Sequence, residues 1–265
     1  VEAFKGVAMD AILIAIDYKG LPRQSNIPSF GKDTVAIHKA LDHLNMIRSQ
    51  LKQRYGAPCI MQTCAHEPES FFGNFDIQVN NTSRQFINIF NSGLVSEVVG
   101  TDDFLLDVAA IAETVGLANW HDPVMYHMAK LPFAQKLVPF YAEQVCRIIS
   151  AMSGKARRAL ILDLDNTLWG GVIGDDGLSG IELGQGNALG EAYLAVQNTV
   201  LKLRQRGIVL AVCSKNNDTT ARIPFREHPD MLLNESHIAV FRANWEDKVP
   251  NIQFIAETLN LGLES

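Results

Sequence analysis

Short apolar runs alternate with amphipathic helical stretches along this sequence, and that alternation restricts its fold more than any other feature. Met9 to Asp17 and Pro58 to Thr63 are interpreted as buried strands in the first half. Ala159 to Leu164, Ile208 to Cys213 and His237 to Phe241 are the strands expected in the second half. Continuous apolar runs are typical of parallel strands covered on both faces, and helices between them imply right-handed crossovers. We therefore predict an α/β fold with parallel sheets.

The segments between these strands have the apolar spacing of helices or the composition of loops. The expected helices are one capped by Thr34, Ser83 to Phe90, Asp107 to Val115, Phe133 to Met152, Ala188 to Arg206, one from about Asp218, and Val249 to Leu259. Pro22 to Lys32 and Glu67 to Asn74 are predicted loops. Ser153-Gly154-Lys155 ends a helix, so we predict two Rossmann-like domains, residues 1–153 and 154–265.

Composition narrows the function classes. The 265 residues include 23 Lys and Arg against 29 Asp and Glu, and the longest basic run is Lys155 to Arg158, so nucleic-acid binding is not expected. No apolar run approaches the ~18–20 residues of a membrane helix. Four cysteines in a chain this long do not form a disulfide framework, and Cys59 and Cys64 have no second pair at zinc-site spacing. No secretory or transit signal is visible in a sequence that opens on Val1, so the cytoplasm is the expected compartment.

Two carboxylates follow the first strand of the second half, in the sequence Asp163-Leu-Asp165-Asn-Thr167. In a continuing strand they would face opposite sides, but at a strand end the backbone can curl and bring both into one pocket. Open α/β sheets bind ligands just beyond the carboxyl ends of their strands. Asp163 could attack a phosphorus atom, Asp165 could serve as general acid and then base, and a hard cation such as Mg²⁺ would explain the concentrated acid. A turn or helix cap is the alternative.

Further polar groups follow the next two strands. Ser214 ends the run Val212-Cys-Ser214, where a hydroxyl and backbone N–H groups before a helix could cradle a phosphate. A helix cap is the alternative for this serine. Lys248 follows the third strand, where an ammonium could neutralise phosphate charge and orient the nucleophile.

The order of DxDxT, strand-end serine and lysine before a helix resembles motifs one to three of the haloacid dehalogenase (HAD) superfamily. The resemblance covers nearly all of the second half and implies a HAD-type core with aspartyl-phosphate chemistry. It implies that Asp163 is the nucleophile, that Asp165 is the general acid/base, and that Asp163 and the Asp165 carbonyl bind Mg²⁺. It also implies that Thr167, Ser214 and Lys248 hold the phosphoryl group of a small phosphorylated substrate.

A finer resemblance lies in Leu164 to Gly177, VCSKNN at 212–217 and NWEDK at 244–248. These segments resemble the FkbH-like branch (HAD subfamily IIIC), whose members release phosphate from a phosphorylated glycerate donor and load the glyceryl group onto an acyl carrier protein. The resemblance implies such a carrier as partner and makes Cys213 a candidate catalytic thiol. A helix N-terminus and nearby lysines could lower the pKa of that thiol, while a small buried strand residue is the alternative.

One feature departs from the HAD pattern. HAD proteins carry a fourth motif of paired acids after another strand, and the sequence ends at Leu261 to Ser265 where that strand would begin, so we expect the second domain to lack one metal ligand. The glycine-rich insert from Trp169 to Gly186 stands where HAD proteins have a flap over the site. Gly184 to Gly190 nearly spells a dinucleotide loop, but its third glycine is one position late and no strand precedes it.

Residues 1–153 resemble the later part of an SGNH-hydrolase-like domain, which FkbH-like proteins often carry ahead of the HAD domain. The catalytic serine, Gly-x-Asn-Asp and Asp-x-x-His of such hydrolases are not found. Ile16-Asp17-Tyr18 stands at the relevant strand end, and Asp122 and His127 are five residues apart. We expect a degenerate, non-catalytic binding or scaffolding domain, and an active esterase is the alternative.

Two hypotheses of different classes follow. The first is an Mg²⁺-dependent phosphatase or phosphotransferase, with water or a carrier thiol accepting the organic group. The second is a non-catalytic HAD-like module that holds a carrier or partner protein. A structural role has no need of two acids at a strand end, which favours the enzyme, whereas the expected loss of the fourth motif keeps the binding module open.

Overall fold

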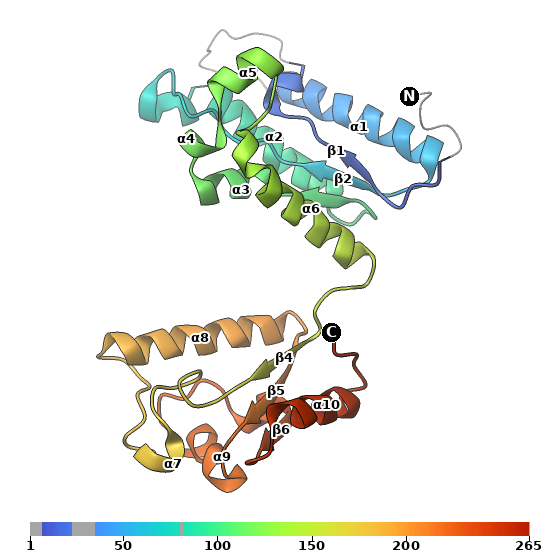
Figure 1. The fold of residues 1–265 in the computed structure, drawn as a ribbon. Helices are drawn as coiled ribbons and strands as arrows, with labels where there is room; N and C mark the ends of the chain where they lie inside the picture. Colours follow the sequence, from blue (N-terminus) through green and yellow to red (C-terminus); the bar gives the residue numbers. More distant parts are fainter. Residues whose placement is uncertain (1–6, 23–34, 80–81, 265) are drawn as a thin grey trace. The chain divides into compact units, whose positions relative to one another are not determined.

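The computed structural model describes residues 7–22, 35–79 and 82–264, and the chain divides into two compact units, Val1–Ser153 and Gly154–Ser265 (Figure 1). Both contain a three-stranded, wholly parallel sheet, so the predicted α/β fold with parallel sheets is confirmed. The expected Thr34 cap and nearly all of the Pro22 to Lys32 loop lie outside the described residues. No helix in the described ranges is both long and apolar enough to cross a membrane.

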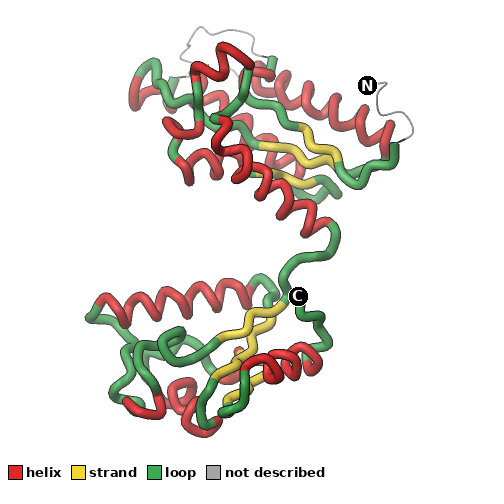
Figure 2. The backbone as a smooth tube through the Cα atoms, in the orientation of Figure 1, coloured by secondary structure: helices red, strands yellow, loops and turns green. Residues whose placement is uncertain are grey.

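The sheet of the first unit has the order β1 (Ile12–Ile14), β2 (Cys59–Gln62), β3 (Phe104–Leu106). Its helices are α1 (Val35–Tyr55), α2 (Ser83–Val98), α3 (Val108–Val115), α4 (Leu117–Trp120), α5 (Pro123–Ala129) and α6 (Val138–Met152). Side chains of β2 alternate between two cores, because Cys59 and Met61 pack with α1 and α2 while Ile60 packs with α3 and α6. Helices therefore cover both faces of this sheet (Figure 2).

The first unit differs from the predicted elements at three places. The strand predicted from Met9 to Asp17 is short, because the Asp17 side chain accepts hydrogen bonds from the Lys19 and Gly20 amides and turns the chain into the 3₁₀ helix η2 (Tyr18–Gly20). Strand β3 and the helices α4 and α5 were not predicted. The helix expected from Phe133 starts at Val138, after the 3₁₀ helix η4 (Gln135–Leu137), and the Phe133 ring stacks on Trp120 with centroids 4.7 Å apart.

The sheet of the second unit has the order β4 (Ala159–Leu162), β5 (Val209–Ser214), β6 (Ile238–Ala243). Four α-helices accompany it: α7 (Ile173–Asp176), α8 (Ala188–Gln205), α9 (Asp218–Glu227) and α10 (Lys248–Thr258). Leu210 and Val212 belong to the core that includes residues of α8 and α9, and Ala211 packs with Ile255 of α10 on the other face. The carboxyl ends of all three strands consequently lie at one edge of the sheet.

The segment from Gly184 to Gly190, which resembles a dinucleotide loop in sequence, contains a glycine that the fold requires. Gly190 lies in the first turn of α8, where a Cβ atom would come within 2.6 Å of the Gly184 carbonyl oxygen. The glycine at 190 is therefore required for the close approach of the preceding loop, which supports setting the dinucleotide interpretation aside.

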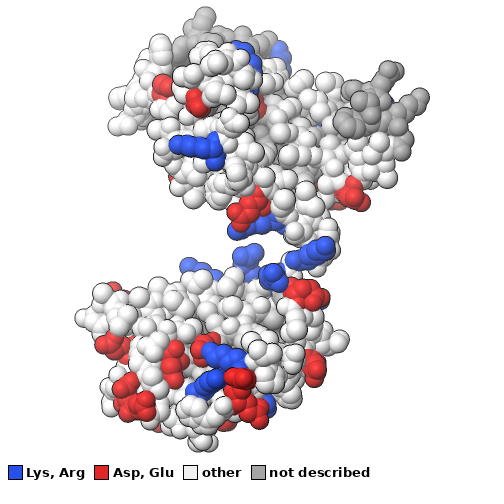
Figure 3. Space-filling model, in the orientation of Figure 1, with Lys and Arg blue, Asp and Glu red and all other residues white. Residues whose placement is uncertain are grey.

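Charged side chains are mixed on the surface of the described residues. Figure 3 shows Lys and Arg interspersed with Asp and Glu on the visible face, with no continuous basic groove there. Several charged side chains of the described residues form local ion pairs. Arg222, for example, pairs with Asp218 at 2.8 Å and with Glu235 at 2.9 Å. The visible face thus lacks the concentrated positive charge that a polyanion groove requires.

One fully buried glutamine joins three parts of the second unit. Gln197 of α8 is 0% exposed, donates to the Leu168 carbonyl at 2.8 Å, and accepts from the Leu232 and Leu233 amides at 2.9 and 3.3 Å. Backbone groups buried in this way are costly to leave without partners.

Replacing Gln197 by leucine should destabilise the second unit by about 3 kcal/mol, because it leaves buried backbone groups unpaired at ~1–3 kcal/mol each. Urea unfolding of the whole chain, followed by tryptophan fluorescence, measures the change. Gln205→Leu makes the same chemical change at the exposed end of the same helix and should alter stability by less than ~0.5 kcal/mol. Equal midpoints for the two variants would show that the buried network contributes nothing.

Candidate active site

Asp163, Ser214 and Lys248 come together at the carboxyl edge of the second sheet. Asp163 directly follows β4, Ser214 is the last residue of β5, and Lys248 is the first residue of α10 beyond β6. The Lys248 ammonium donates to Asp163 Oδ2, and Asp163 Oδ1 accepts from the Leu164 amide at 2.9 Å. The Ser214 side chain also hydrogen-bonds to the Asp163 carboxylate. Three of the predicted site residues are therefore in direct contact.

This environment keeps Asp163 ionised. Burial raises the pKa of its carboxyl, but the hydrogen bonds from Lys248, the Leu164 amide and Ser214 lower it by more, so the pKa lies below its ordinary value. The side chain is 38% exposed, so one side of the carboxylate is open to an incoming molecule. An ionised and accessible carboxylate is the chemical requirement for nucleophilic attack.

Asp165 is held by the insert that follows it. Its Oδ1 accepts from the Trp169 indole N–H at 3.0 Å and from the Ile173 amide at 3.1 Å, and its Oδ2 accepts from Asn216 Nδ2 at 2.7 Å. Between Asp165 and the insert, Asn166 adopts a left-handed conformation with φ 54°, which asparagine tolerates better than most residues. The carboxylate of Asp165 is thus fixed in orientation by three donors.

Asn216 belongs to this network although it was not among the predicted site residues. It is 2% exposed, and its amide group donates to Asp165 and also to Ser214 Oγ at 3.3 Å. Asn216 therefore links the second carboxylate to the serine that touches the first. The available signal was an amide side chain two residues beyond a strand-end serine, but Asn217, which caps α9, had the same appearance in the sequence.

Thr167 lies in the turn after Asp165, where its amide donates to the Leu164 carbonyl at 3.0 Å. Within the described residues its hydroxyl makes no hydrogen bond to Asp163, Ser214 or Lys248. Lys215 points elsewhere and pairs with Asp247 at 3.3 Å on the surface. Thr167 and Lys215 therefore take no part in the contacts that join Asp163, Ser214 and Lys248.

Successive side chains of a strand point to opposite faces of the sheet, so Cys213 does not point the same way as Ser214. Its side chain is 3% exposed and packs with Ala211, Val240 and Ile255 on the α10 side of the sheet. We expected the neighbouring lysines to bring the pKa of this thiol below its ordinary value, and that expectation is wrong. Burial, which is the largest influence, raises its pKa above the ordinary value, and Lys248 lowers it by less.

Oxygen ligands for a cation are available at Asp163, but the described residues contain no cluster of three or more His, Cys, Asp or Glu side chains that could hold a metal. One carboxylate and a backbone carbonyl are compatible with Mg²⁺, because that ion usually takes one or two carboxylates and keeps several waters. Asp175 and Asp176 of the insert do not add ligands to this set in the structure. Asp176 instead accepts from the Val172 amide at 2.7 Å within its own turn.

Comparison with known proteins finds one clear structural relative. The chain is similar to the N-terminal part of the protein BF1531 from Bacteroides fragilis, described as containing a phosphatase domain and solved in complex with Mg. The sequences are 34% identical, the TM-score is 0.79, and the match covers 88% of this chain, so it extends over both units. The match covers 62% of the solved chain of that protein, so this chain spans less than two thirds of it. No family model matches the chain, and no curated protein sequence does so.

The pair of Lys248 and Asp163 should be visible in the titration of Asp163. Lys248→Met removes the strongest influence that lowers the pKa while burial remains, so the midpoint of the Asp163 carboxyl should move to higher pH. In the unchanged protein the ionised form stabilises the fold above the unfolded pKa of an aspartate, and this contribution is lost as pH falls through the lowered native pKa. Carbonyl ¹³C NMR of the aspartates measures both midpoints.

Lys215→Met provides the matched control, because this exposed lysine pairs with Asp247 and not with Asp163. It should leave the Asp163 titration unchanged. Identical Asp163 midpoints in the Lys248 variant and the unchanged protein would contradict the assigned electrostatics.

Proposed function

We propose that the second unit is a HAD-type, Mg²⁺-dependent phosphatase or phosphotransferase that acts through an aspartyl-phosphate on a small phosphorylated substrate. The observation that carries the proposal is the contact of ionised, partly exposed Asp163 with Lys248 and Ser214 at the strand ends. The likeness to a protein with a phosphatase domain, solved with Mg, supports the same chemistry.

Each residue would have its own role in this reaction. An Asp163 oxygen would form a bond to phosphorus while the bond from phosphorus to the leaving oxygen breaks, and that oxygen would take a proton from Asp165. Asp165 would then take a proton from water as that water attacks the phosphorus and releases phosphate from Asp163. Lys248, Ser214 and Thr167 would hold the phosphoryl oxygens. Mg²⁺, held by the Asp163 carboxylate, the Asp165 carbonyl and waters, would offset the charge on these oxygens.

Asp165 can serve as acid and base only if it exchanges one of its donors for the substrate. Its oxygens are occupied by Trp169, Ile173 and Asn216, and two of these belong to the insert. Movement of the insert would therefore accompany the proton transfers. A binding-only module is less well supported, because it has no use for an accessible ionised carboxylate beside a lysine.

The nucleophile is tested by two substitutions and one control. Asp163→Asn should abolish both p-nitrophenyl phosphate hydrolysis with Mg²⁺ and the phosphorylated protein detectable by mass spectrometry after acid quenching, because an amide does not attack phosphorus as a carboxylate does. Asp165→Asn should lower kcat by about 10²–10⁴-fold, the usual contribution of one acid–base group. Asp230→Asn, at an exposed position, should retain full activity. Normal turnover by the Asp163 variant would exclude the covalent mechanism.

The finer proposal concerns the acceptor of the organic group. The FkbH-like resemblance favours transfer of a glyceryl group to the thiol of an acyl carrier protein. Cys213 is the sole cysteine of the second unit, yet its thiol is buried and its pKa is raised, so a relay through it requires the thiol to become exposed first. Direct acceptance by the carrier thiol has no such requirement, and we favour it.

Intact-mass measurement distinguishes these routes. With a phosphorylated glycerate donor and a phosphopantetheinylated carrier protein, we expect the carrier to gain one glyceryl group, and the Cys213→Ala variant to load it equally well. A glyceryl adduct on Cys213, lost in that variant together with loading, would instead establish the relay. An adduct on Cys59, Cys64 or Cys146 would place the relay on another sulfur. Phosphate release with free glycerate and an unmodified carrier would leave a plain phosphatase.

A further inference from the structure

A hollow opens at the carboxyl edge of the first sheet, among residues that the proposed phosphatase chemistry does not use. It consists of two adjoining cavities of about 160 and 290 Å³ that share Tyr18, His121 and Pro132. Tyr18 lies a few residues beyond β1, and Cys64 of the smaller cavity lies just beyond β2. This is the edge at which open α/β sheets bind ligands.

Aromatic rings line much of the smaller cavity. Phe133 stands between Trp120 and Tyr141, with ring centroids 4.7 and 5.0 Å away, and these rings form one wall. Leu13 of β1 also lines the cavity and is 38% exposed. The polar lining residues make hydrogen bonds within the protein; they are Asp17, Gln62 and Thr63. The volume is close to the ~150 Å³ of an engineered apolar cavity that binds benzene. It therefore has room for one apolar side chain of about that size.

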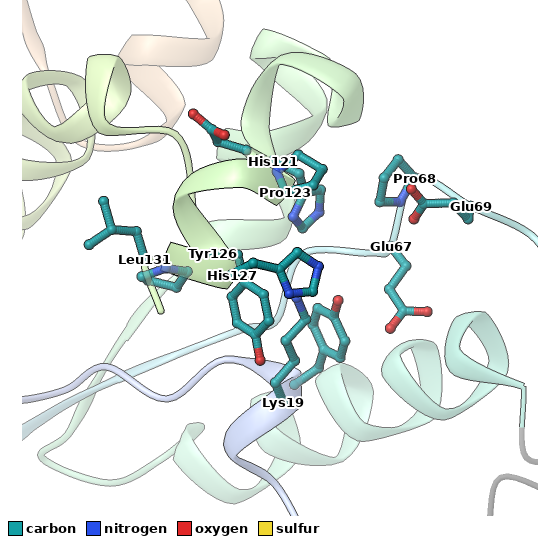
Figure 4. Close-up of a pocket in the computed structure, with 12 residues that line it drawn as sticks. Lys19, Glu67, Pro68, Glu69, His121, Pro123, Tyr126, His127 and Leu131 are labelled. Atoms are coloured by element: carbon teal, nitrogen blue, oxygen red, sulfur yellow. The ribbon is translucent and has the colours of Figure 1, made fainter. Parts of the chain in front are cut away.

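The larger cavity carries charges of both signs at its mouth. Figure 4 shows Glu67 and Glu69 on one side, Tyr126 and His127 on the other, and Lys19 between them. The Lys19 ammonium lies 3.3 Å from the centroid of the Tyr126 ring. Throughout residues 7–22, 35–79 and 82–264, no oppositely charged side chain forms an ion pair with Lys19, Glu67 or Glu69. The cavity has a third carboxylate, Asp122, which caps α5 by accepting from the Met125 amide at 3.0 Å, and Glu67 is hydrogen-bonded to the Tyr18 side chain. The mouth thus presents a cation and two glutamates that do not form ion pairs with one another.

His121 stands where the two cavities join. Its Nε2 lies 2.7 Å from the His66 carbonyl oxygen, which can only accept, so Nε2 carries the hydrogen. In the neutral ring Nδ1 is then an acceptor. An acceptor at the junction, near carboxylates at the mouth, suits an ammonium group placed between the polar and apolar parts of a ligand.

We propose that this hollow binds an apolar α-amino acid. The ligand's carboxylate would lie at Lys19, its ammonium would face His121 and the glutamates, and its side chain would enter the aromatic cavity. A ligand with one charge alone would leave either Lys19 or the glutamates without a counter-charge. The zwitterion is therefore favoured over an apolar amine or an apolar acid.

The hollow fits binding better than catalysis. Burial, followed by the nearby Glu67, raises the pKa of the Tyr18 hydroxyl, and burial raises the pKa of the Cys64 thiol to about 12. The Tyr18 hydroxyl and the Cys64 thiol are therefore both neutral at neutral pH, and neither is an activated nucleophile.

Calorimetric titration of the whole chain with four probes tests each part of the ligand. L-Phenylalanine should bind, while 3-phenylpropionate, phenethylamine and glycine, which lack the amine, the carboxylate and the side chain respectively, should each bind at least about tenfold more weakly. Lys19→Met should weaken L-phenylalanine binding by a similar factor and leave phenethylamine unaffected. Glu69→Gln should weaken L-phenylalanine and leave 3-phenylpropionate unaffected.

Lys130→Met is the matched control, because Lys130 also lies over the Tyr126 ring, at 5.0 Å, without lining either cavity. It should bind L-phenylalanine as the unchanged protein does. Absence of L-phenylalanine binding at millimolar concentration would overturn the proposal. So would phenethylamine binding as tightly as L-phenylalanine, which would mean that the carboxylate is not recognised.

Discussion

The contact between Asp163 and Lys248 joins residues 85 positions apart, and it exists because parallel pairing brings two strand ends to one edge. Leu162 of β4 is in register with Val212 of β5, and Ser214 at the end of β5 is in register with Ala243 of β6. Asp163 and Lys248 follow the outer two strands, and Ser214 lies between them. Burial raises the pKa of Asp163, and Lys248 is the largest of the influences that lower it, ahead of the Leu164 amide and Ser214. The sheet register therefore places the group that does most to lower the pKa of the proposed nucleophile.

Asp165, the second carboxylate of the site, connects it to the glycine-rich insert through hydrogen bonds. Trp169 donates to Asp165 while its ring is fully buried and packs edge-on against Phe225, with centroids 6.0 Å apart. The orientation of Asp165 is thus coupled to the core through one indole. Because Ile173 of the insert donates to the same carboxylate oxygen, any movement of the insert changes the hydrogen bonding of Asp165. This coupling offers a physical route by which substrate entry could control the proton donor.

The sequence allowed the strands of the second unit and the residues at their ends to be predicted, because each apolar run stops at a polar side chain. It did not reveal Asn216, whose role depends on where a turn directs one amide, and turns carry no periodic signal. It placed Cys213 next to Ser214 but did not show which way the thiol points: alternation along β5 directs it to the α10 side of the sheet, where it donates to the Lys248 carbonyl oxygen at 3.9 Å. Strand β3 was missed because Phe104–Leu106 is too short to form a recognisable apolar run between Asp103 and Asp107.

In each unit the proposed site lies at the carboxyl edge of a parallel sheet, but the side chains at the two edges differ in chemistry. At the carboxyl edge of the second sheet, Asp163 is ionised and accessible, and the proximity of Lys248 and Ser214 suits a reaction at a charged phosphoryl group. At the corresponding edge of the first sheet, the thiol of Cys64 and the hydroxyl of Tyr18 are held neutral by burial. The hollow at that edge has an aromatic wall with separated charges, which suits the proposed ligand and supplies no activated group. In these two proposals, the difference between a binding and a catalytic edge thus arises from which strand-end side chains are buried.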